Sequence, residues 1–170
     1  FPDDIEKNDE IRNATNLIRL LTRGIFIWFV KEKNLVPEIL FDHNQLGDLL
    51  KDFNKNQKSH NYYNAILQNL FFGTLNQKMD ERGFASDGSF KQNQKNYGIK
   101  NLYRYSDQFV IAKEEAIELF KDIPFLNGGL FDCLDKDNEN SKVLYSDGFS
   151  RNPQKQAIVP DFLFFNKEMV

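Results

Sequence analysis

The chain has 170 residues, which is enough for one domain with a sizeable core and marginal for two. Hydrophobic residues make up 41% of it and charged residues 28%, values that exclude disorder of the whole chain. The net charge of −3 excludes the overall basic character of an autonomous DNA-binding protein, so any nucleic-acid contact must rest on a local patch.

The compartment is predicted from three absences. The single cysteine, Cys133, allows no intramolecular disulfide, which suits a reducing cytoplasm. The longest apolar-looking run, residues 17–30, is too short to span a bilayer, and no signal peptide is visible. We therefore expect a cytoplasmic protein with no membrane partner. The missing initiator methionine leads us to expect a fragment of a larger chain.

The first predicted helix covers residues 14–33, after a loose, acidic lead-in at residues 1–12, and Asn13 or Thr15 is expected to cap it. Apolar residues at helical spacing predict its buried stripe: Leu17, Leu21, Ile25 and Trp28, widened by Ile18 and Phe29. Arg19 and Arg23 share a second face, where such a pair more often bonds carboxylates or carbonyls than DNA phosphate.

Two more helices follow. Residues 45–53 predict a short one, and residues 54–61 a polar loop. The second strong helix is expected at residues 61–79, where the inward positions have helical spacing. They are Tyr63, Ile66, Leu67, Leu70, Phe71, Leu75 and Met79.

The second half of the sequence is less regular. Residues 83–108 predict a long irregular insertion, residues 112–122 a third helix, and residues 135–142 a charged flexible loop. Residues 157–160 and 162–165 favour short strands or extended packing segments. The predicted fold is mainly α: a single helical domain over residues 1–170, with long irregular loops and room for a few short strands.

The motifs of three enzyme classes are incomplete or missing. Pro160-Asp161 supplies half of a common nuclease motif, but no lysine has Asp or Glu two residues before it. The glycine turn and the Asn/Asp-Pro-Pro-aromatic motif of amino-methyltransferases are absent, and so is a phosphate-binding loop. His43, His60 and Cys133 do not form a zinc pattern. We therefore predict no catalytic residue, no metal site and no cofactor in this chain.

Residues 90–105 are the predicted DNA-contacting segment, because cations and aromatic side chains alternate there without an acidic residue. The candidate contacts are Lys91, Lys95, Tyr97, Lys100 and Arg104. The alternative is a solvated basic loop whose tyrosines are pinned to the body of the domain.

Residues 123–132 are the predicted docking segment for a neighbouring domain. Its candidate residues are Asn127, Gly128, Gly129 and Phe131. Adjacent glycines permit positive φ or close backbone approach. The alternative is a turn that packs its apolar side chains into the local core.

Six segments together resemble one protein family. They are residues 20–29 (LLTRGIFIWF), 62–72 (YYNAILQNLFF), 100–105 (KNLYRY), 123–132 (IPFLNGGLFD), 147–151 (DGFSR) and 159–161 (VPD). In this order they resemble the helical region that precedes the methyltransferase domain in large single-chain restriction-modification enzymes. Adenine methyltransferases of phage-defence systems are similar.

The resemblance implies what kind of enzyme the chain belongs to, but no catalytic residue of the family has a counterpart in this sequence. It implies a non-catalytic connector whose partners are the methyltransferase and other domains of the same parent chain, and which contacts the backbone of duplex DNA. S-adenosylmethionine would be the cofactor of the parent enzyme. Two rivals stay open: a protein-interaction scaffold without nucleic-acid contact, and an enzyme with an unfamiliar site.

Overall fold

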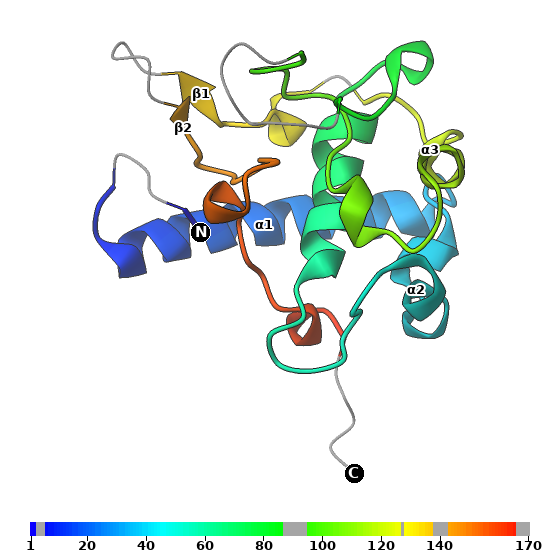
Figure 1. Ribbon diagram of the computed structural model, residues 1–170, viewed down its shortest axis with the longest axis horizontal. Coiled ribbons are helices and arrows are strands. Elements are labelled where there is room, and N and C mark those ends of the chain that lie inside the picture. The colour runs from blue at the N-terminus through cyan, green and yellow to red at the C-terminus, as the bar shows by residue number, and fades with distance from the viewer. Residues whose placement is uncertain (3–5, 87–94, 127, 138–142, 166–170) are drawn as a thin grey trace.

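The computed structural model describes residues 1–2, 6–86, 95–126, 128–137 and 143–165. Helices dominate, and the mainly α fold predicted from the sequence is confirmed. Figure 1 shows the long helix α1 (blue) running behind the central helix η2 (green), with α2 and α3 beside them. No helix in the described ranges is both long enough and apolar enough to cross a membrane.

Helix α1, Asp9–Glu32, begins earlier than predicted. The side chain of Asn8 caps it, accepting hydrogen bonds from the backbone nitrogens of Glu10 at 3.0 Å and Ile11 at 3.1 Å. Two acidic residues in the first turn complement the helix dipole. The expected caps Asn13 and Thr15 therefore lie inside the helix, and the lead-in is shorter than residues 1–12.

The predicted buried face of α1 is wrong. Leu17, Leu21, Ile25 and Trp28 are exposed, as are Ile18 and Phe29. The buried residues of the helix are instead Arg12, Asn16, Leu20, Arg23, Ile27 and Val30. The inward face includes two arginines: Arg12 bonds the nearby Asp9, whereas the partners of Arg23 lie more than a hundred residues away in the sequence.

Helix η2, Tyr62–Leu75, is a π-helix that forms the centre of the core. All its residues are buried, as expected for a helix that is apolar on most sides. Six of the seven inward positions predicted here are confirmed. The helix ends four residues earlier than predicted, and Met79 is exposed because it lies in the short 3₁₀ helix η3, Met79–Glu81.

Helices α2, His43–Leu49, and α3, Lys113–Phe120, correspond to the short helices predicted at residues 45–53 and 112–122. Leu50 follows α2 in extended conformation and forms an antiparallel bridge with Phe109, so the predicted helix at residues 45–53 is too long. The 3₁₀ helices η1, Glu38–Phe41, and η4, Ser106–Gln108, precede α2 and α3 respectively.

The described part of the predicted insertion is tied to the core. Phe84 and Tyr103 form a parallel bridge, and Tyr103 and Tyr105 are buried. The tyrosines at these two positions are therefore pinned to the body of the domain. Residues 87–94 lie outside the described ranges.

The C-terminal third forms a hairpin and several short turns. Strands β1, Lys136–Asp137, and β2, Val143–Leu144, pair antiparallel with Lys136 opposite Leu144, at the two ends of the predicted loop. The 3₁₀ helices are η5, Gly129–Phe131, η6, Pro153–Lys155, and η7, Asp161–Leu163. Residues 157–160 form no strand, and Ala157 donates its backbone N–H to the carbonyl of Gly148 at 3.1 Å. The prediction for residues 162–165 is wrong, because η7 and a turn occupy them.

Asp161 joins this tail to the start of η2. Its carboxylate accepts hydrogen bonds from the backbone nitrogens of Asn54 at 2.8 Å and Tyr62 at 3.0 Å. The side chain is buried, and burial raises its pKa above the usual value. The Pro-Asp pair noted as half of a nuclease motif thus caps a helix.

Candidate functional site

The inward face of α1 carries a buried guanidinium. Arg23 is only 3% exposed, and it sits among apolar residues of the core. A buried arginine needs partners for its five N–H donors, because an unpaired charge in the interior is costly. The hydrogen-bond partners of Arg23 therefore show which segments of the domain it joins.

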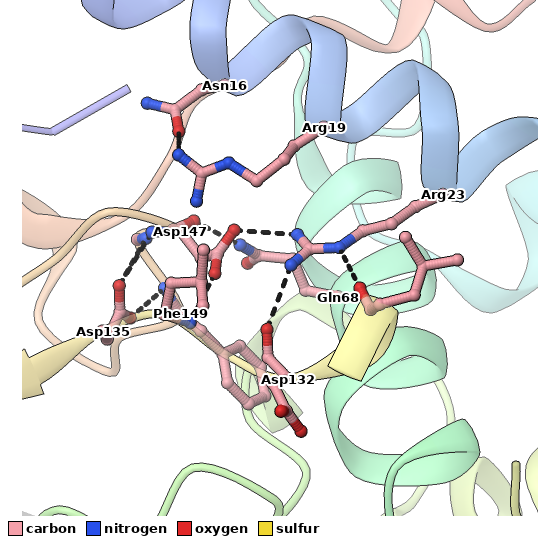
Figure 2. Close-up of polar contacts among 11 residues, drawn as sticks. Asn16, Arg19, Arg23, Gln68, Asp132, Asp135, Asp147 and Phe149 are labelled. Carbon is pink, nitrogen blue, oxygen red and sulfur yellow. Dashed lines mark hydrogen bonds and ion pairs between the residues drawn. The ribbon is translucent and has the colours of Figure 1, made fainter. Parts of the chain in front are cut away.

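Arg23 joins segments that are more than a hundred residues away (Figure 2). Its Nη1 donates to Oδ1 of Asp147 at 2.8 Å. Its Nε donates to the carbonyl of Leu130 at 2.9 Å, and its Nη2 to the carbonyl of Asp132 at 3.0 Å. The guanidinium also lies over Phe72, with 5.0 Å from Cζ to the ring centroid. One side chain thus ties α1 to η2, to the end of η5 and to the turn after β2.

Two buried carboxylates organise that turn. Oδ2 of Asp147 accepts from the backbone nitrogen of Leu134 at 2.6 Å. Asp135 accepts from the backbone nitrogens of Asp147 at 2.8 Å, Gly148 at 3.1 Å and Phe149 at 2.9 Å. Burial, and next the nearby Asp147, raise the pKa of Asp135, while the three N–H donors oppose this shift.

Helix η2 contributes Gln68 to the same cluster. Its Nε2 donates to the carbonyl of Asp147 at 2.8 Å, and its Oε1 accepts from the hydroxyl of Tyr105 at 2.7 Å. The backbone nitrogen of Ser150 donates to that hydroxyl at 3.1 Å. Burial raises the pKa of Tyr105 well above its usual value, so the hydroxyl stays protonated and can donate.

These residues form what we call the Arg23 network: Arg23, Gln68, Tyr105, Asp135 and Asp147. Four of them, together with the carbonyls that Arg23 bonds, come from five of the six segments that carry the family resemblance. The sixth segment supplies the helix-capping Asp161. What the six segments share in this fold is therefore a set of structural hydrogen bonds.

Arg19, the other member of the predicted arginine pair, lies at the edge of the network. Its Nη2 donates to Oδ1 of Asn16 at 2.7 Å on the same helix (Figure 2). The expectation that this pair bonds carboxylates and carbonyls rather than phosphate is confirmed for Arg23.

The opposite side of α1 is apolar and exposed. We call it the outer face of α1, and its large side chains are Ile11, Leu17, Ile18, Leu21, Ile25, Phe26, Trp28 and Phe29. Ile18 is 65% exposed, Ile25 70% and Trp28 61%. A contiguous exposed apolar surface of this kind usually marks a contact with another molecule or domain.

The predicted DNA-contacting residues differ in their exposure to solvent. Lys95 is exposed, Tyr97 and Lys100 are half-buried, and Lys91 lies outside the described ranges. Arg104 is half-buried with its Cζ 4.4 Å from the centroid of the Phe149 ring, and its Nη2 donates to the carbonyl of Ile99. Arg104 thus has a structural partner, whereas Lys95 points to solvent.

The predicted docking residues lie around η5. Asn127 is outside the described ranges. Gly128 has a φ of −166°, an extended conformation open to any residue, so the permitted positive φ is not used there. Phe131 is buried against Phe26 and Phe71, with ring centroids 5.4 and 5.8 Å apart. The packing alternative holds for Phe131.

The remaining chemistry-bearing residues are dispersed. Within the described ranges, no group of three or more His, Cys, Asp or Glu side chains is placed to hold a metal ion. Cys133 is half-buried, and burial raises the pKa of its thiol well above the usual value, as expected for a packed rather than a nucleophilic cysteine.

Comparison with known proteins connects the chain to restriction-modification systems. It is 34% identical over 124 residues to a protein of Methanocaldococcus jannaschii named "Putative type II restriction enzyme and methyltransferase". No protein-family model and no solved structure matches the chain.

The alignment covers 73% of this chain but only 8% of the archaeal protein. The chain therefore matches only a small part of the length of the archaeal protein. The finding relates it, over most of its own length, to a protein of the restriction-modification type.

Proposed function

We propose that the chain is a non-catalytic helical connector in a larger restriction-modification or phage-defence adenine methyltransferase. Its partners would be the methyltransferase and other domains of the same polypeptide, and the parent enzyme would use S-adenosylmethionine. One observation carries the proposal: the Arg23 network engages its ionisable side chains within the fold and leaves an apolar outer face on α1.

The mechanism is positioning. The network joins α1, η2 and the C-terminal turns through buried hydrogen bonds, and such fully paired networks make a domain rigid. A rigid body with an apolar outer face can hold neighbouring domains in a fixed relation. Methyl transfer depends steeply on such alignment, because small displacements of reacting groups lower rates by large factors.

The test separates cofactor binding from methyl transfer in the full-length polypeptide that contains this chain. Arg23→Met removes the cation of the network. We expect the methylation rate on duplex DNA to fall at least about tenfold, while the dissociation constant for S-adenosylmethionine changes less than about twofold. Weakened cofactor binding, or an unchanged methylation rate in a folded variant, would contradict a positioning role.

We also propose that the connector contacts the DNA backbone through residues 95–104. Lys95 is exposed, and no acidic residue lies between positions 90 and 105. Such a contact is electrostatic and independent of base sequence. Arg104 is left out of the test because its loss would disturb the packing on Phe149.

Binding of the chain to a labelled duplex of random sequence, followed across a salt series, tests this contact. The double variant Lys95→Ala/Lys100→Ala should bind more weakly and reduce the slope of log K against log salt by about 1 to 2. The matched control is Lys55→Ala/Lys58→Ala, at two exposed lysines of another loop. Equal effects of the two pairs, or no binding at low salt, would favour the scaffold without nucleic-acid contact.

A further inference from the structure

Between Ile11 and Trp28 the outer face of α1 bears no charge, and at its C-terminal end Lys33 lies over the Phe29 ring, with 5.5 Å from Nζ to the ring centroid. The ionisable residues between Ile11 and Phe29 are Arg12, Arg19 and Arg23, and none of them is on the exposed side. Solvent-facing helix surfaces are normally rich in Lys, Glu and Arg. This helix has the reverse arrangement: arginines point into the domain and large apolar side chains point out of it. The face is therefore built to be covered.

The spacing of the exposed residues matches that of a helix–helix seam. Ile11, Ile18 and Ile25 are seven residues apart, and Leu21 and Trp28 repeat the same interval between them. Ile18, Leu21, Ile25 and Trp28 alternate three and four residues apart over about 15 Å of helix, which is the spacing of a seam along which a second helix packs.

Gly24 lies on the exposed side of the same stretch. A Cβ atom built at Gly24 meets nothing within 4 Å, so the space beside its backbone is open. Gly24 adjoins the seam position Ile25, and its missing side chain leaves room for a second helix beside the seam. The facing helix must itself be uncharged along the seam, because nothing on α1 would pair a charge that is buried there.

We infer that the outer face of α1 docks a helix that lies elsewhere in the same restriction-modification polypeptide and that presents apolar residues at seven-residue spacing. This inference rests on the proposed function. The archaeal relative is more than ten times longer than the segment aligned with this chain, so such a protein has ample chain to supply the helix. A segment of the same polypeptide also has an effective concentration on the order of millimolar, which favours it over a second copy of the chain.

Photo-cross-linking in the full-length polypeptide tests the docking directly. A benzophenone amino acid is placed at Ile18 or at Ile25, and the attached peptide is identified by mass spectrometry. Both positions should attach to one segment outside these 170 residues, at sites about seven residues apart. Attachment to α1 of a second copy, to scattered sites, to lipid, or to nothing would overturn the inference. Ile158, which is 58% exposed, is the control position and should not attach to that segment.

A double substitution supplies a second readout. Ile18→Glu/Ile25→Glu should leave the melting temperature of the isolated chain within about 2 °C, since both side chains are exposed there. In the full-length polypeptide it should abolish the cross-link from a probe at Leu21, whereas Val110→Glu, at another exposed apolar position, should not. Retention of the cross-link would overturn the inference. The proposed function fails by a different result, an Arg23→Met variant with normal methylation, so the two failures are distinguishable.

Discussion

Arg23 and Asp147 form an ion pair that is almost inaccessible to water. Their side chains are 3% and 4% exposed. Moving two charges out of water is costly, and the geometry must repay that cost through close contact and further hydrogen bonds. Asp147 has a backbone donor on its second oxygen, and Arg23 has two carbonyl acceptors. The loss of either charge would leave the other buried without its partner.

Replacing Arg23 by methionine should therefore lower the free energy of unfolding by about 3 kcal/mol, the lower end of the range for breaking a buried ion pair. Urea unfolding of the isolated chain measures this. Lys121→Met removes one member of the exposed pair with Glu118, which also has a 2.8 Å contact, and should not shift the midpoint measurably. Similar effects of the two substitutions would show that the Arg23 network is not a major source of stability.

At the scale of elements, the packing of η2 against Tyr103 depends on one glycine, Gly73. A Cβ atom at Gly73 would lie 2.5 Å from Cδ1 of Tyr103, a ring that is itself fully buried. Tyr103 is also held by a hydrogen bond between its hydroxyl and Thr74, so it cannot move aside easily. The close approach of the irregular segment to the central helix therefore requires glycine at this position.

Gly73→Ala should destabilise the domain by about 1 to 3 kcal/mol through overpacking, although alanine is the better helix former. Gly47→Ala in α2 is the matched control, because a Cβ there meets nothing within 4 Å. It should raise stability by about 0.5 to 1 kcal/mol. Thermal unfolding of the two variants should thus give shifts of opposite sign, and shifts of the same sign would contradict this packing.

The sequence was sufficient to locate the helices but not to orient α1. Periodicity shows that apolar residues share a face, yet it does not show whether that face meets this domain or another one. The residues that decide the orientation of α1 are Arg23 and Asp147, which are 124 positions apart. Local patterns contain no information on such a pair.

The Arg23 network could not be predicted from the sequence for a related reason. Its members are scattered among apolar segments, and the sequence pattern singles out only Arg23, as one of two arginines on a second face of the first helix. The usable signal was the presence of Gln68 inside a helix that is otherwise apolar on most sides, since a buried amide must have partners. The basic segment was found because its lysines are neighbours in the sequence, and its contact with DNA remains a prediction.

At the scale of the whole molecule, stability should depend on pH through Asp135. Burial raises its folded-state pKa above the value of 3.8 for a free side chain. The folded protein then holds this proton more tightly than the unfolded chain does. Asp135 therefore contributes stability that is complete below pH 3.8 and is lost as the pH rises through the raised pKa.

The comparison of wild type with Asp135→Asn isolates this contribution, because asparagine does not titrate while every other group is retained. The difference in their free energies of unfolding, wild type minus variant, should fall as the pH rises above 3.8 and become level beyond the raised pKa. Urea titrations at a series of pH values measure it. A difference that stays constant or increases with pH would contradict the raised pKa.

The large sequence separation between Arg23 and Asp147 also affects how the chain folds during synthesis. The carboxylate partner of Arg23 is made 124 residues later, which at ribosomal rates of about 5 to 20 residues per second is on the order of ten seconds. Throughout that interval Arg23 of the nascent α1 has no carboxylate partner. A helix with exposed apolar residues on one side, and with Arg23 still lacking its carboxylate partner on the other, is then a natural binding site for chaperones, so the early part of the chain should depend on them more than the late part.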